Sequence, residues 1–168
     1  MRHEGFAPVI ADNPTLLILG SLPGVRSIEE QRYYAHPRNV FWRIMSELIG
    51  FDLNASYESR CRALTSAGVA LWDVLQESHR EGSLDSAIDM ASARTNDFEE
   101  LFACKQSIRA IACNGAKAYD MFQKRVVPKL ADNQVPVLLK LPSSSPANAA
   151  ISYEQKLRDW STLRQFLD

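Results

Sequence analysis

Residues 15–24 read TLLILGSLPG, an apolar run followed at once by a loop rich in glycine and proline. A second apolar run, Val135 to Leu139, precedes the loop LPSSSP at 141–146. Parallel strands end at one edge of a sheet, and open α/β sheets bind ligands at that edge. Glycine and proline fix tight turns, while serine supplies small hydrogen-bond donors. The two loops therefore predict one site for a phosphate-bearing ligand.

Apolar runs and helical patterns alternate along the chain. Strands are expected at 15–19, 69–72, 108–113 and 135–139. Helices are expected at about 37–50, 57–67, 96–103, 115–126 and 153–167. The polar stretch 76–94 is expected to be a loop with at most one helical turn. Because strands separated by helices pair in parallel, we expect one α/β domain over residues 1–168, with three layers and a short central parallel four-stranded sheet flanked by helices.

The charge of the chain limits the kinds of partner it can have. Its formal net charge is −1, whereas proteins that coat long stretches of nucleic acid rely on many Lys and Arg contacts to phosphates. A small footprint with a local basic patch remains compatible with this charge. The alternative is a solvated loop in which Glu29 and Glu30 balance the cations. The residues of the candidate patch are Arg26, Arg32, His36, Arg38 and Arg43.

The cysteines are Cys61, Cys104 and Cys113, which are widely spaced and form no C-x-x-C pair. We therefore expect buried, reduced thiols and no zinc or iron–sulfur site. No apolar run is long enough to span a membrane, and residues 1–14 lack the apolar core of a signal peptide. We expect a cytoplasmic monomer with no cofactor, no metal and no membrane partner.

Residues 33–42 read YYAHPRNVFW and hold the side chains that most suggest chemistry. Tyr34 offers a flat surface that can either stack on a ligand or pack against the protein. The amide of Asn39 can orient a water molecule, whereas Phe41 and Trp42 are typical of a core. The loop 20–24 lacks the lysine of a Walker A loop and the third glycine of a dinucleotide fingerprint, so by itself it also fits a plain turn.

Four motifs together resemble the uracil-DNA glycosylase superfamily: GSLPG at 20–24, YAHPRNVFW at 34–42, GVALWDVL at 68–75 and LPSSSPA at 141–147. The second motif is similar to the mismatch-specific uracil and thymine glycosylases. The first and last most resemble the hypoxanthine-DNA glycosylase branch. The resemblance covers about residues 15–150. It implies base flipping and hydrolysis of the N-glycosidic bond of a deaminated base in DNA, foremost hypoxanthine.

The resemblance also implies roles for individual residues. Leu22 stands where many relatives carry the Asp or Asn that positions the attacking water, so this role passes to Asn39. Gly24 replaces a bulky residue of the strict uracil enzymes and leaves room for a purine. Tyr34 matches the aromatic that stacks on the flipped base. Asn114 can bind the base edge or a phosphate, although a simple Asn-Gly turn explains it as well.

The expected enzyme is monofunctional, because no nucleophilic lysine lies in a matching motif and water must attack the sugar. Its expected base pocket comprises Gly20, Ser21, Leu22, Pro23, Gly24, Tyr34 and Asn114. Its expected DNA-binding residues are Arg38, Ser143, Ser144, Ser145, Pro146, Ala147 and Asn148. Three other interpretations stay open: a mismatch-specific uracil glycosylase, a non-catalytic nucleotide-binding α/β module, and a hydrolase of small nucleosides.

Overall fold

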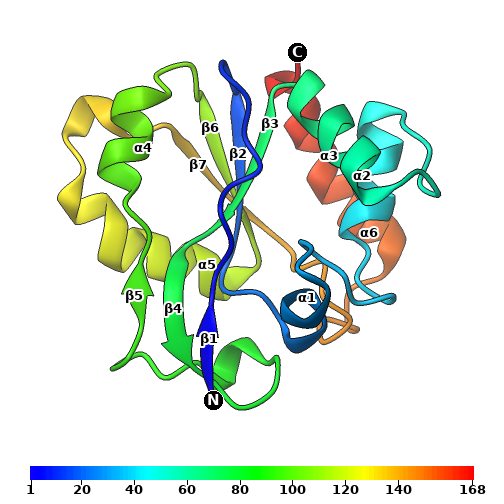
Figure 1. Cartoon of the computed structure of the whole chain (residues 1–168). Helices are drawn as coiled ribbons and strands as arrows, with labels where there is room; N and C mark the ends of the chain where they lie inside the picture. The colour runs from blue at the N-terminus through cyan, green and yellow to red at the C-terminus, as the bar shows by residue number, and fades with distance from the viewer.

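The computed structural model describes all residues from 1 to 168. A parallel four-stranded sheet with the strand order β3-β2-β6-β7 forms its centre (Figure 1). The bounds are Leu16–Gly20 for β2, Val69–Asp73 for β3, Ala110–Asn114 for β6 and Val137–Leu141 for β7. All four expected strands are present. The last begins two residues later than expected, because Pro136 has no N–H to contribute to the sheet.

Strand β2 explains why the sheet lies at the centre of the molecule. All five of its residues are buried, as expected for a central strand covered on both faces. Leu16 and Ile18 belong to one apolar cluster, and Leu17 and Leu19 belong to another. Because successive side chains of a strand point to opposite faces, the two clusters are the two cores on either side of the sheet.

Helices cover both faces of the sheet, which confirms the expected three-layer α/β fold. Helices α2, α3 and α6 pack on one face, and α4 and α5 pack on the other (Figure 1). Their bounds are Phe41–Ile49 for α2, Tyr57–Ser66 for α3, Phe98–Cys104 for α4, Ala116–Met121 for α5 and Tyr153–Trp160 for α6. A π-helical stretch, Phe122–Val126, continues α5, and a 3₁₀ helix, Ser161–Phe166, continues α6.

Two details of the helices differ from the expectation. Helix α2 begins at Phe41 instead of near residue 37, and a short helix α1, Val25–Glu30, occupies part of the preceding loop. Asp97 caps α4, since its carboxylate accepts a hydrogen bond from the Glu100 N–H at 3.0 Å. The helix cap expected at Asn96 therefore lies one residue later, at Asp97. These shifts fall at element ends, where sequence patterns are least informative.

The expectation of a loop over 76–94 holds for residues 80–93 but is wrong at both ends of the stretch, which are strands. Strands β1 (Arg2–Glu4), β4 (Leu75–His79) and β5 (Arg94–Thr95) form a second, antiparallel sheet in the order β1-β4-β5. Within β4 only Leu75 and Ser78 are buried, so its apolar pattern is weak. The one helical turn expected in this stretch is present as a 3₁₀ turn, Asp85–Ala87.

The cysteines only partly match the expectation. Cys113 is buried, Cys61 is half-buried and Cys104 is exposed, and all three are free thiols. The expectation of burial is wrong for Cys104, because it is the last residue of α4 and lies outside the core. None of the helices is long and apolar enough to cross a membrane.

Candidate active site

A cavity of about 960 Å³ lies where the four parallel strands end. The last residue of each strand lines it: Gly20, Asp73, Asn114 and Leu141. The loop 20–24, Tyr34, Asn39 and the loop 143–148 also line it. The structure thus brings together every expected site residue except Arg38. Arg38 lines a neighbouring cavity of about 530 Å³ that shares Tyr34 and Asn39 with the large one.

Asn39 lies in the turn just before α2. Its side-chain carbonyl accepts a hydrogen bond from the Phe41 N–H at 3.0 Å. Its own backbone N–H donates to the His36 carbonyl at 2.9 Å. The side chain is therefore held by the start of the helix. Because an amide oxygen has two lone pairs, it can still accept a hydrogen bond from a water molecule in the cavity.

Tyr34 adopts a left-handed backbone conformation, with φ of 54°, that side-chain-bearing residues seldom adopt. Its ring stacks on Phe41 with centroids 4.1 Å apart. Its hydroxyl is buried, and no hydrogen bond of ordinary geometry reaches it. Burial, followed by the charge of Asp73, raises the pKa of this phenol well above its usual range, and the nearby Asn114 amide offsets this only in part. Tyr34 is thus neutral at physiological pH.

Gly20 and Asp73 face each other across the paired ends of β2 and β3. A Cβ atom at Gly20 would lie 2.5 Å from Asp73 Oδ1 and 3.2 Å from the Tyr34 hydroxyl oxygen. The first distance is too short for non-bonded atoms. Glycine is therefore required at this position so that the Asp73 carboxyl and the Tyr34 phenol can both line the cavity.

Asp73 also lines the cavity, although the sequence motifs do not mark it as a site residue. It is only 4 % exposed, and its Oδ2 has no hydrogen-bond partner. Burial raises the pKa of this carboxyl to about 7, with Asp85 adding to the shift and Arg80 opposing it. The signal that could have revealed it is an acidic residue at the end of an otherwise apolar strand, at the sheet edge where ligands bind.

Residues 80–85 hold the loop 20–24 in place through hydrogen bonds. The Ser21 hydroxyl donates to the Asp85 carboxylate, and the buried Arg80 guanidinium donates to the Pro23 carbonyl. Leu22 is 6 % exposed and packs into the core beneath this loop. A Cβ atom at Gly24 would lie 3.3 Å from Ser83 Oγ, so a bulky side chain there would push against residue 83.

Asn114 and Ser144 join β6 to the serine loop 143–148. Asn114 Nδ2 donates to Ser144 Oγ at 2.8 Å, and the Ser144 N–H donates to Asn114 Oδ1 at 2.9 Å. The Ser144 carbonyl in turn accepts a hydrogen bond from the Val40 N–H at 3.1 Å. Ser144 is 1 % exposed, so its hydroxyl holds the loop in place and faces the protein interior.

The rest of the serine loop is shaped by its own side chains. Ser143 Oγ accepts from the Ser145 N–H, and Ser145 Oγ accepts from the Ala147 N–H, both at 3.2 Å. The Asn148 side chain donates to the Ser143 carbonyl at 3.2 Å. The hydroxyl hydrogens of Ser143 and Ser145 stay free to bind an anion such as a phosphate.

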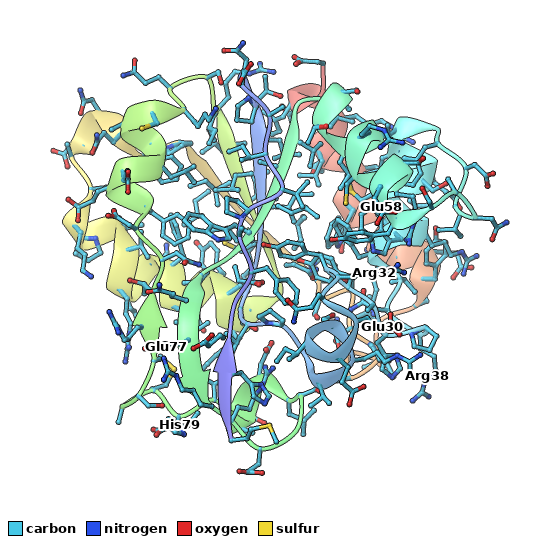
Figure 2. The ribbon with its side chains drawn as sticks, viewed as in Figure 1. Glu30, Arg32, Arg38, Glu58, Glu77 and His79 are labelled. Atoms are coloured by element: carbon cyan, nitrogen blue, oxygen red, sulfur yellow. The ribbon has the colours of Figure 1, made fainter.

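Basic side chains surround the cavity. Lys117, Lys140, Arg26 and His36 line it, although Arg26 is paired with Glu30 at 2.6 Å. Figure 2 shows Arg38 at the outer edge of the molecule beside α1, near Glu30. The candidate basic patch is thus partly balanced by acidic residues, as the alternative interpretation expects. No group of three or more His, Cys, Asp or Glu side chains could hold a metal ion.

Comparison with known proteins places the chain in a family. The model of the Uracil DNA glycosylase superfamily matches residues 7–164. The chain belongs to this superfamily. A hypoxanthine DNA glycosylase from Methanosarcina acetivorans is 36 % identical over 164 residues, which cover 97 % of this chain and 98 % of the relative. One from Methanosarcina barkeri is 40 % identical over 119 residues, 70 % of this chain and 74 % of the relative.

The fold is also found among solved structures. A solution NMR structure from Methanosarcina acetivorans, described as a candidate uracil DNA glycosylase, superposes with a TM-score of 0.81 at 34 % identity. The match covers 98 % of both chains. The superfamily resemblance and the α/β fold expected from the sequence are therefore both confirmed.

Proposed function

We propose that this protein is a monofunctional DNA glycosylase that removes hypoxanthine from DNA by water attack. One observation carries the proposal. A single cavity receives Asn39, Tyr34 and the loop 20–24, while Leu22 replaces the polar side chain that orients water in many superfamily members. The names of the two Methanosarcina relatives support hypoxanthine as the base.

Asn39 orients the attacking water. An amide is too weak a base to take a proton from water at neutral pH, so its contribution is position and hydrogen bonding. The bond from the Phe41 N–H fixes the direction of the Asn39 carbonyl before the substrate arrives. Such preorganisation avoids reorientation during the reaction, which is a main source of enzymatic rate enhancement.

Tyr34 stacks on the flipped base. One face of its ring is covered by Phe41, so the base uses the opposite face. The stack with Phe41 and the hydroxyl buried near Asp73 hold the ring in one orientation. A deaminated base pairs weakly in the duplex, which lowers the free energy needed to extrude it.

The serine loop and the surrounding cations bind the DNA backbone. Ser143, Ser145 and the neighbouring backbone supply hydrogen-bond donors, and Lys117 and Lys140 add positive charge at the cavity. Arg38 lies beside the second cavity and contacts a phosphate next to the flipped nucleotide. These contacts position the duplex without reading its sequence. They also suit a chain with a net charge of −1, because they need only a small footprint.

A mismatch-specific uracil glycosylase is the second candidate. The observation that favours it is the fold neighbour described as a candidate uracil DNA glycosylase. The two candidates differ in the size of the base and in the hydrogen bonds at its edge. A pocket that pairs with the edge of hypoxanthine leaves buried polar groups unpaired when another base enters.

A panel of damaged duplexes tests the proposal. Duplexes carrying hypoxanthine, uracil, xanthine or mispaired thymine are incubated with excess protein, and abasic sites are cleaved and counted. Hypoxanthine is expected to be released fastest. Fastest release of uracil or thymine would favour the second candidate. Release from free deoxyinosine only would identify a nucleoside hydrolase, and nucleotide binding with no base release would identify a non-catalytic module.

A further inference from the structure

We propose that Asp73 is the proton donor for the departing purine. This inference rests on the proposed excision of hypoxanthine and assigns a second group to the same site. Asn39 orients water toward the sugar, but the base must also leave. An unprotonated purine would depart as an anion, and the cavity holds one buried carboxyl placed to prevent this.

The position of Asp73 argues for a ligand contact. Its carboxyl lines the cavity, and Oδ2 is buried without any hydrogen-bond partner. A buried polar atom without a partner is unfavourable by about 1–3 kcal/mol, so such atoms in native folds call for an explanation. The backbone carbonyl of Asp73 accepts a hydrogen bond from the Asn96 side chain at 2.8 Å, but no hydrogen bond of the fold uses its carboxyl. The side chain is thus available to a base that enters the cavity.

Glycine at position 20 keeps this carboxyl accessible. Any side chain there would collide with Asp73 Oδ1. The Tyr34 hydroxyl oxygen borders the same space, 3.2 Å from where a Cβ atom of residue 20 would lie. A base stacked on the Tyr34 ring is therefore brought next to Asp73, which places the carboxyl at the edge of the purine.

The charged and titratable groups that face Asp73 come from three segments. Arg80 follows β4, Asp85 lies in the 3₁₀ turn after it, and Tyr33 and Tyr34 precede α2. Arg80 makes no hydrogen bond to Asp73: its Nη2 contacts the Pro23 carbonyl and His3, and its Nε and Nη1 have no partner. Burial therefore outweighs Arg80, and the pKa of Asp73 rises to about 7. A carboxyl of this kind is protonated in a large share of the molecules at neutral pH and can release its proton during the reaction.

Other groups in the cavity suit this role less well. Asn39 is a neutral amide without an acidic proton, and the phenol of Tyr34 has its pKa raised far above neutrality. Asp85 is already bonded to the Ser21 hydroxyl. Asp73 is the only acid of the cavity that is buried, and its Oδ2 has no hydrogen-bond partner.

The step conserves atoms and charge. As the bond between C1′ and N9 breaks, its electron pair moves onto the purine, and the Asp73 proton passes to a ring nitrogen, so neutral hypoxanthine leaves. The oxygen of the water held by Asn39 bonds to C1′ and loses one proton to solvent. Solvent then returns a proton to the Asp73 carboxylate. In sum, one water is consumed and hypoxanthine and an abasic sugar are formed.

Single-turnover excision between pH 5.5 and 8.5 tests this role. With wild-type protein, the rate on a hypoxanthine duplex is expected to fall about tenfold from pH 6 to pH 8, because the acid form of Asp73 is lost around pH 7. Asp73→Asn is expected to lower the rate roughly 100-fold at pH 6 and to remove this decline. DNA affinity should change little, since the isosteric amide keeps the shape of the site. The matched control is Asp120→Asn on the exposed side of α5, which should retain the wild-type profile.

Two results would overturn the assignment. One is a wild-type rate that stays flat or rises between pH 6 and pH 8, a measurement that needs no variant and holds even if Asp73→Asn does not fold. The other is a folded Asp73→Asn protein with the wild-type rate or the wild-type decline. A wild-type protein that leaves hypoxanthine in place at every pH would instead refute the proposed function, so the two failures are distinguishable.

Discussion

Asn114 and Ser144 are joined by two reciprocal hydrogen bonds, from Asn114 Nδ2 to Ser144 Oγ at 2.8 Å and from the Ser144 N–H to Asn114 Oδ1 at 2.9 Å. The same serine accepts a hydrogen bond from the Val40 N–H, next to Asn39. Ser144 therefore ties together the end of β6, the serine loop and the start of α2. These are three walls of one cavity, and Ser144 contacts all three.

Ser144→Ala is expected to destabilise the protein by about 1–3 kcal/mol, because it leaves Asn114 Nδ2 buried without its partner. Urea unfolding followed by circular dichroism measures this change. Ser145→Ala is the neighbouring control, since its hydroxyl accepts only a local backbone bond at 3.2 Å. Equal stability of Ser144→Ala and wild type would show that the Ser144 hydroxyl does not hold the loop.

Tyr34→Ala is expected to weaken capture of the flipped base by roughly 1–3 kcal/mol, the usual contribution of stacking on an aromatic ring. Binding of a duplex that carries a non-cleavable deoxyinosine analogue measures this loss. Tyr34→Phe keeps the ring and should bind within about twofold of wild type by the same stacking argument. If Tyr34→Ala binds as well as Tyr34→Phe, the ring only packs against Phe41.

Gly20→Ala is expected to disturb the cavity, because the new methyl group would overlap Asp73 Oδ1. Overpacking of this kind typically costs about 1–3 kcal/mol. Gly24→Ala is the milder counterpart, since its methyl group would meet only the flexible Ser83 side chain at 3.3 Å. Thermal unfolding should rank the proteins as wild type, then Gly24→Ala, then Gly20→Ala. The reverse order of the two variants would contradict the contact between β2 and β3.

Asp73→Asn is expected to stabilise the fold above neutral pH. The folded-state pKa of Asp73 is about 7, above that of an unfolded chain, so the native state holds the proton more tightly. The stability of wild type should therefore fall as the pH rises from about 4 to 7 and then level off. The asparagine variant lacks this loss and should gain on the order of 4 kcal/mol at pH 8 but little near pH 4. Denaturant unfolding at both pH values measures the difference, and an equal gain at both would contradict the raised pKa.

The central sheet could be predicted because its strands are short, apolar and buried on both faces. For this reason the run 15–19 clearly predicts a strand. The loops at its end and after Leu139 mark the edge of the sheet where a ligand is expected to bind. The second sheet could not be predicted. Strand β4 buries only Leu75 and Ser78, and its partner β1 lies at the N-terminus, 75 residues away for the contact of Arg2 with Glu77. Pairing between such distant segments leaves almost no local pattern.

Much of the candidate site followed from the order of its motifs along the chain. Asn39, Tyr34 and the two loops line the same cavity because each stands just after or before an element that the sequence reveals. Asp73 was missed because its environment is tertiary. Its burial and its unpartnered oxygen depend on Gly20 and Tyr34, which are distant in sequence. Ser144 likewise looks like an ordinary loop serine in the sequence, because its hydrogen bonds to Asn114 form only in the folded structure.

Single-turnover release of hypoxanthine by wild type and by Asn39→Ala tests the central claim most directly. Asn39→Ala removes the acceptor that we propose orients water, and the rate is expected to fall roughly 100-fold while DNA binding is retained. It also removes the bond to the Phe41 N–H, which should lower the free energy of unfolding by about 1 kcal/mol. The assay is therefore run well below the unfolding temperature of the variant. Asn54→Ala, on the exposed loop after α2, should match wild type. Undiminished release of hypoxanthine by folded Asn39→Ala would contradict the account.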